Sequence, residues 1–188
     1  MTKDTDTARR RNGDVMIFSK TTDFGLSTYF KTLAGVLGAP GRFFSQLSDP
    51  VPFRRSFGFL LVSSLFFAMG SFVCFKSDPF IMTGIFLVNA LFMPFLSAGM
   101  AYLIIILTAG NRIHFQKLFA IYAFAGGVTL LVSWIPFTVW FTEPWKWGLI
   151  GLGMMKGGGL GWRQVVMVIG FSILLLVLLF WALMPQTP

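Results

Sequence analysis

The sequence has few charged residues for its length. Of its 188 residues only 12% are charged, whereas 55% are hydrophobic and 23 are Phe. A soluble globular domain carries about 25% charged residues, so a water-soluble fold of this composition would expose much apolar surface. The shortage of charge therefore argues against a soluble domain and predicts an all-α integral membrane protein.

The chain also has a single cysteine, Cys74, and a single histidine, His114. One cysteine cannot form an intrachain disulfide, and these two residues cannot supply the three or four ligands of a zinc site. The long apolar segments contain no carboxylate pair, and an unactivated Ser or Thr hydroxyl is a poor nucleophile. We therefore expect no enzyme activity, no catalytic residues, no metal site and no bound cofactor.

What the sequence does have is a series of long apolar runs. A membrane helix needs about 20 mostly apolar residues to cross a hydrocarbon core about 30 Å thick. Five segments are candidates, and only the fourth is interrupted by charge, at Glu143 and Lys146. We expect the regular helix of this fourth segment to begin near Pro144, a residue suited to a first helical turn. The predicted spans lie at about 57–75, 81–107, 118–135, 137–155 and 165–183, in a membrane domain of residues 53–188.

The net charge of +8 is distributed unevenly along these spans. If the N-terminus is cytoplasmic, five spans leave every basic residue except Lys76 and Lys146 on the cytoplasmic side. This is the asymmetry of the positive-inside rule, so we expect the N-terminus inside and the C-terminus outside. We assign the basic charge to lipid head groups and not to nucleic acid. The expected head-group contacts are Lys31, Arg42, Arg54, Arg55, Lys156 and Arg163.

Two regions precede the first span. Residues 1–23 are polar and lack the apolar core of a signal peptide, which predicts a basic, mostly disordered cytoplasmic tail. Residues 24–52 carry apolar side chains at helical spacing until Gly38 and Pro40 interrupt the pattern. We expect one or two amphipathic helices here, lying on the cytoplasmic membrane surface. A cytosolic hairpin packed on the membrane domain is the alternative. The spaced residues are Leu26, Phe30, Leu33 and Leu37.

Within the spans, a few residues are candidates for polar or close helix contacts. Asn89 either holds a ligand or a partner helix, or forms an interhelical hydrogen bond worth about 0.6 to 2 kcal/mol. Pro94 lacks one helical donor and marks a kink in the long second span. Small residues let helix backbones approach closely. The glycines expected to do so are Gly127, Gly153 and Gly157.

The glycine-rich run at residues 153–161 suggests a phosphate-binding loop at first sight. It lacks the GxxxxGK[ST] spacing that makes such a loop bind a nucleotide. Two interpretations remain: a lipid head-group site flanked by Lys156 and Arg163, or a flexible turn between two helices.

In their order, these features resemble the Yip-domain (Ypt-interacting protein) family. Residues 39–47 (APGRFFSQL) resemble that family's P-x-x-F-F-x-x-L helix, and residues 110–125 resemble its G-G-x-x-x-F segment with the following Y-A pair. Asn111 stands where the family has a second Gly. Residues 134–136 (WIP) are similar to its Ile-Pro break, and residues 151–163 to its approach to the last span.

The resemblance implies a compact, five-span protein of the bacterial inner membrane. Eukaryotic members act in vesicle traffic and contact small GTPases and one another, whereas bacterial members mostly have no assigned activity. We expect a non-catalytic scaffold, organiser or accessory subunit, with membrane lipids and other membrane proteins or copies of itself as partners. The alternative is a protein for lipid handling or small-molecule permeation, in which the second span opens toward a midplane cavity. An enzyme acting on lipids is a third reading.

Overall fold

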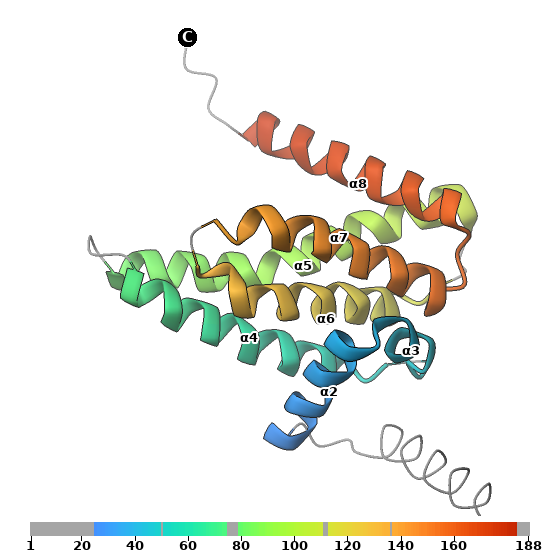
Figure 1. Cartoon of the computed structure of the whole chain (residues 1–188). Coiled ribbons are helices and arrows are strands. Elements are labelled where there is room, and N and C mark those ends of the chain that lie inside the picture. Colours follow the sequence, from blue (N-terminus) through green and yellow to red (C-terminus); the bar gives the residue numbers. More distant parts are fainter. Residues whose placement is uncertain (1–24, 50, 75–78, 111–112, 136, 184–188) are drawn as a thin grey trace, which may run out of the picture.

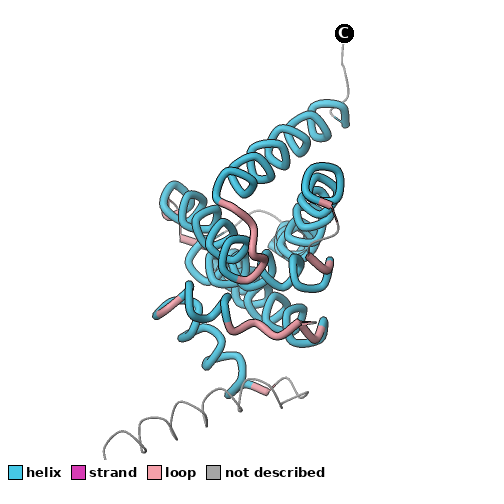
Figure 2. The backbone as a smooth tube through the Cα atoms, turned by 90° about the vertical axis from the view of Figure 1, so that its right-hand side faces the viewer, coloured by secondary structure: helices cyan, strands magenta, loops and turns pink. Residues whose placement is uncertain are grey.

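The computed structural model describes residues 25–49, 51–74, 79–110, 113–135 and 137–183. The predicted tail at residues 1–23 and the predicted outer residue Lys76 lie outside the described part. Within it the chain forms seven helices and no strand, so the predicted all-helical class is confirmed (Figure 2). The helices are α2 (Leu26–Gly38), α3 (Pro40–Ser45), α4 (Phe53–Cys74), α5 (Pro79–Ala109), α6 (Phe115–Ser133), α7 (Val139–Lys156) and α8 (Trp162–Leu183).

Four of the described helices are long and apolar enough to cross a membrane. Helix α7 is not among them, because it carries Glu143, Lys146 and Lys156 within 18 residues. The expectation that this helix begins near Pro144 is wrong. It begins at Val139, and Pro144 lies inside it. The four apolar segments are Phe53–Phe72, Phe80–Thr108, Phe115–Ser133 and Trp162–Leu179.

The five longer helices run back and forth between the same two ends of the molecule (Figure 1). Helices α4, α6 and α8 begin at the end beside α3, and α5 and α7 finish there. Helix α8 diverges from α7 toward its C-terminal end, in both views of the backbone. The described chain is therefore an up-and-down bundle with one splayed helix.

Helix α6 is the centre of this bundle. It packs against α2, α4, α5 and α7, and every residue from 118 to 129 is buried. Aromatic rings from its neighbours meet on it: the rings of Phe43 and Phe59 lie 5.3 and 5.4 Å from the ring of Phe124 in edge-to-face geometry. Such pairs contribute about 0.5–1.5 kcal/mol beyond the area that they bury.

Glycines let the neighbouring helices approach α6 closely. A Cβ added to Gly127 on α6 would lie 2.7 Å from the ring of Phe59 on α4. A Cβ added to Gly153 on α7 would collide with Ile121 on α6. At Gly157, after the last residue of α7, an added Cβ would lie 3.0 Å from the carbonyl oxygen of Phe44 on α3. Close approach of this kind supplies the van der Waals contact that holds helices together in lipid.

The two short N-terminal helices pack against the bundle. The ring of Tyr29 on α2 stacks on Phe59 at 4.9 Å, and its hydroxyl lies 3.1 Å from that of Ser63 on α4. Helix α3 buries Phe43 and Phe44 and contacts α7.

The apolar stripe expected on α2 mostly faces away from the protein. Its protein-facing side is instead formed by Tyr29, Thr32 and Val36, which are buried. Helix α2 is thus attached to the bundle on one side and apolar on the other, which suits a helix at a membrane surface. The exposed members of the stripe are Leu26, Phe30 and Leu37.

The close contact at Gly127 gives a first prediction. Gly127→Ala should lower the free energy of unfolding by about 1–3 kcal/mol, because the added methyl group overpacks against Phe59. The matched control is Gly126→Ala, where the new Cβ would meet only Pro94 at 3.5 Å, an ordinary contact. This control should be neutral or slightly stabilising, since Ala favours the helix over Gly by up to about 1 kcal/mol.

Both variants can be measured in detergent micelles by thermal and denaturant unfolding followed by circular dichroism. Equal stability of the two variants would contradict the close α4–α6 packing at Gly127.

Candidate functional site

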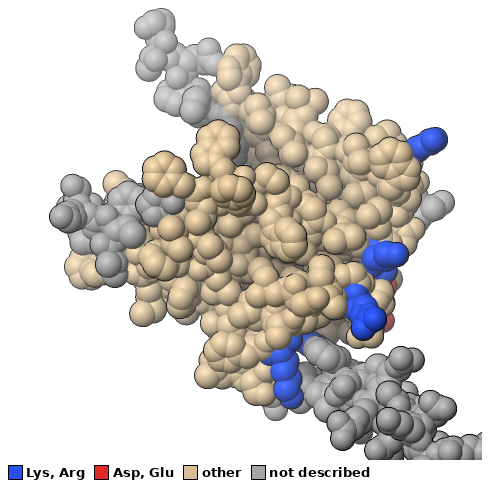
Figure 3. All heavy atoms as spheres, in the orientation of Figure 1, with Lys and Arg blue, Asp and Glu red and all other residues tan. Residues whose placement is uncertain are grey.

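Basic side chains gather at one end of the bundle, which we call the basic end. Apart from Lys146, every described Lys and Arg lies on α2, on α3, or where α4, α6, α7 or α8 meets this end. Figure 3 shows them at the end of the molecule beside α3, with none at the opposite end of this face. Five of the six residues expected to contact head groups are exposed here. They are Lys31, Arg42, Arg54, Lys156 and Arg163.

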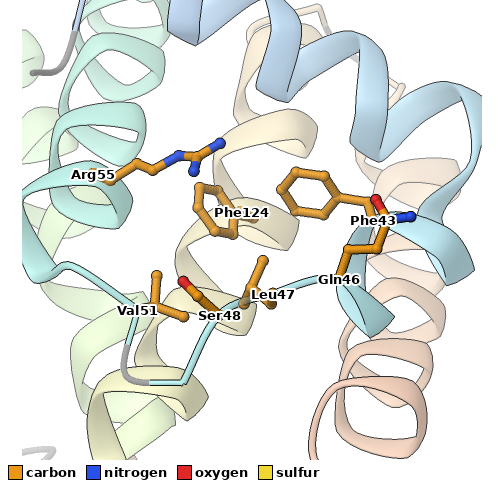
Figure 4. Close-up of a pocket in the computed structure, with 7 residues that line it drawn as sticks. All are labelled: Phe43, Gln46, Leu47, Ser48, Val51, Arg55 and Phe124. Atoms are coloured by element: carbon orange, nitrogen blue, oxygen red, sulfur yellow. The ribbon is translucent and has the colours of Figure 1, made fainter. Parts of the chain in front are cut away.

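Arg55 differs from these five because it is partly buried. Its side chain extends from α4 toward the rings of Phe43 and Phe124, at a small pocket beneath the α3–α4 connection (Figure 4). The pocket has a volume of about 30 Å³, enough for little more than a water molecule. It is too small for a lipid head group, so Arg55 belongs with the packing of this end.

An ion-pair cluster also lies at the basic end. Asp49 accepts a hydrogen bond of 3.1 Å from the Lys117 ammonium, and its other oxygen lies 3.4 Å from Nδ1 of His114. The side chain of His114 is 77% exposed, so this is a surface pair worth about 0–1 kcal/mol. It ties the α3–α4 connection to the start of α6. Sequence reasoning missed it because Asp49 and Lys117 are 68 residues apart.

The glycine-rich run closes the C-terminus of α7. The amides of Gly157 and Gly158 donate to Gly153 and Met154 at 2.8 and 3.1 Å, and the amide of Leu160 also donates to Met154 at 3.2 Å. Gly159 has φ +65, a left-handed conformation that glycine adopts without strain. These three amides terminate the helix and are not available to a phosphate group.

A cavity of about 430 Å³ lies inside the bundle, within the usual range for small-molecule sites. Its walls come mainly from α5, α6 and α7. Helices α5 and α7 each pack against α6 and α8 but have no extensive contact with each other. Along α6 the lining runs from Tyr122 to Ser133, about 17 Å at 1.5 Å per residue. Along α6 the cavity therefore extends from the helix end away from the basic end to about the middle of the helix.

Two of the residues predicted from the sequence meet at this cavity, namely Asn89 and Pro94 on α5. Pro94 faces Gly126 on α6, so neither helix presents a long side chain at this point. The amide of Asn89 forms no hydrogen bond with the described residues. The predicted glycines Gly127 and Gly153 lie elsewhere, in the close helix contacts.

Other polar groups share the cavity with Asn89. The hydroxyl of Tyr122 is buried near that of Ser172 on α8, but the two do not reach hydrogen-bonding geometry. At the outer part of the cavity, the ammonium of Lys146 donates to Glu143 at 2.6 Å and lies 5.6 Å from the ring of Trp147. A mostly apolar cavity with a few converging polar groups is the usual form of a binding site.

The arrangement offers little for metal chemistry. Within the described ranges, no three His, Cys, Asp or Glu side chains come together in a way that would hold a metal ion.

Comparison of the chain with protein-family models, with curated proteins and with solved structures finds no match. The resemblance to the Yip-domain family therefore rests on the sequence segments described above.

A second prediction follows from the basic end. Lys156→Gln should reduce the retention of an added anionic lipid, phosphatidylglycerol, about fivefold, since a basic residue near an anionic surface contributes about 1 kcal/mol. Lys146→Gln, ten residues earlier on the same helix and away from the basic end, should leave this retention unchanged. Native mass spectrometry of the purified protein gives the bound fraction. A similar loss in both variants would show that the basic end has no special role in binding anionic lipid.

Proposed function

We propose that the chain crosses the membrane five times, with α7 as the fourth crossing. Helix α7 runs between the same two ends as its neighbours (Figure 1), and its 18 residues span about 27 Å. The charges of Lys146 and Glu143 neutralise each other in an ion pair of 2.6 Å, which lowers the free energy needed to move them from water to the membrane. Exposed Trp residues lie near both ends, as in interfacial aromatic belts. They are Trp140 and Trp145 at one end and Trp162 at the other.

In this topology the basic end is cytoplasmic and the start of α7 faces outward. The positive-inside rule supports this orientation, because Lys146 is the one described cation away from the basic end. The N-terminus is then inside and the C-terminus outside, in a bacterial inner membrane.

Cysteine labelling tests this topology. In a Cys74→Ala background, Trp140→Cys should react with a membrane-impermeant maleimide applied to intact spheroplasts, and Lys156→Cys should react only after lysis. Both positions are exposed and belong to α7. Labelling of both from the same side would mean that α7 does not cross.

The function proposed for the chain is that of a non-catalytic membrane scaffold, organiser or accessory subunit, similar to the Yip-domain family. The main support for this proposal is the exposed surface of helix α8. Only 17% of its apolar segment is buried in the bundle, against 67% in α6. It also turns away from α7, so most of its surface is available to another protein.

The outer face of α8 has the shape that a partner helix needs. Exposed apolar residues recur every three or four positions along its whole length, with Gly170 in the middle. A Cβ added to Gly170 would meet nothing within 4 Å, so this small residue faces outward. Small residues on an outer face allow a second helix to approach closely in lipid. The recurring residues are Val166, Gly170, Leu174, Val177 and Trp181.

Site-specific photo-cross-linking in native membranes tests the scaffold. A photoreactive residue at Leu174 on α8 should give a discrete protein adduct, either a dimer of the chain or a complex with another membrane protein. The control is Val88 on α5, which is equally apolar and is 66% exposed. Absence of any protein adduct at Leu174, with lipid adducts at both positions, would count against a scaffold.

The cavity favours a second candidate function, the handling of a lipid or small amphipathic molecule. Its volume and its converging polar groups support this alternative, and it needs no partner protein.

A further inference from the structure

We propose that the cavity between α5 and α7 binds the zwitterionic head group of a phospholipid, an ammonium linked to a phosphate. This deepens the second candidate function and is independent of the scaffold. Four features of the cavity carry it: its charge pattern, its uncharged polar groups, its position along the helices and the exposed apolar surface of α8 beside it.

The charges of the cavity complement a zwitterion. Glu143 is an acceptor for an ammonium group, and Lys146 is a donor for a phosphate oxygen. The pair is neutral overall, so a ligand with one charge of each sign joins it without leaving a net charge in the cavity. A purely anionic head group would leave the carboxylate of Glu143 opposed by like charge.

Uncharged polar groups line the deeper part of the cavity. Asn89 and Ser97 on α5 form no hydrogen bond with the described residues. Tyr122, on the wall formed by α6, is 2% exposed. Its hydroxyl has no partner in hydrogen-bonding geometry among the described residues. Asn89 is exposed and Ser97 is half-buried, so their side chains are available to the ester and phosphate oxygens of a lipid, whereas the Tyr122 hydroxyl is buried within the wall.

The charged pair of the cavity lies near the start of α7, which the proposed topology places at the outer surface of the membrane. Glu143 is four residues after the first residue of α7, about 6 Å along that helix. A lipid in the leaflet at this end therefore reaches the Glu143–Lys146 pair without leaving its normal orientation.

The acyl chains of this lipid have an apolar path beside the cavity. Leu176 on α8 forms part of the wall, and its neighbours Val177 and Leu178 are exposed. Because α8 diverges from α7 at this end (Figure 1), its exposed apolar residues offer the acyl chains a surface beside the head group.

Lipid retention by the purified full-length protein tests the proposal. Native mass spectrometry should show bound phosphatidylethanolamine, and substitutions at the cavity should lower its retention without lowering that of phosphatidylglycerol, which the basic end retains. Lys146→Gln should reduce the bound phosphatidylethanolamine about tenfold, the loss expected for one hydrogen bond to a charged group. The matched control is Lys117→Gln, which also removes a lysine paired with a carboxylate, at 3.1 Å from Asp49, and should leave the binding unchanged.

A second pair of variants tests the cavity without changing charge. Ala90→Phe adds a ring at the cavity wall and should abolish retention, whereas Val88→Phe adds the same ring on the exposed face of α5 and should retain the lipid. Asn89→Leu, of similar size, should lower retention in a protein that is still folded. Circular dichroism and elution volume establish folding for each variant.

Several outcomes would overturn the proposal. The first is an equal loss of phosphatidylethanolamine and phosphatidylglycerol in Lys146→Gln. The others are equal effects of Lys146→Gln and Lys117→Gln on bound phosphatidylethanolamine, and equal effects of Ala90→Phe and Val88→Phe. Binding of free phosphoethanolamine as tight as that of the lipid would replace the lipid by a soluble zwitterion. None of these results depends on cross-linking at α8, so the proposed scaffold function is tested by a separate experiment.

Discussion

The close contacts around α6 determine how the remaining helices are placed. In lipid no hydrophobic force draws one helix to another, so association depends on van der Waals contact between backbones that approach closely. Gly127 admits the ring of Phe59 from α4, and Gly153 of α7 admits Ile121 of α6. Helices α5 and α7 each pack on this central helix but not extensively on each other. The cavity fills the space that this arrangement leaves between them.

Polar side chains in the bundle fall into two groups, those with a hydrogen-bond partner in their own helix and those without one. The hydroxyls of Thr129 and Ser133 donate to backbone carbonyls in their own helix, at 2.9 and 2.7 Å, so α6 carries them at little cost. Asn89, Ser97 and Tyr122 have no such partner within the described residues, and all three line the cavity. Asn89 and Ser97 are open to a ligand, whereas the Tyr122 hydroxyl is buried; the other buried hydroxyls without a partner among the described residues, on Thr32, Ser64 and Ser172, do not line the cavity.

Hydropathy was enough to predict where the helices lie in the sequence, but not which helices pack against one another. The predicted spans at 57–75, 81–107 and 165–183 lie within a few residues of α4, α5 and α8, because apolar runs that long have few alternatives to a helix. The cavity joins Asn89 to Glu143, and no periodicity relates residues 54 positions apart. Its position depends on which helices touch, which is decided by side-chain shape at contacts such as Gly127.

The proposed head-group site explains both the charges that interrupt the fourth apolar segment and the cavity that these charges line. Charged residues are expensive at membrane depth, and those that occur there usually face a cavity and serve a function. Glu143 and Lys146 keep α7 out of the set of helices apolar enough to cross a membrane, yet α7 runs parallel to that set. Both charged side chains line the cavity. A binding role for the Glu143–Lys146 pair therefore explains why α7 carries these charged side chains, which are otherwise unfavourable in a bundle with uncharged neighbours.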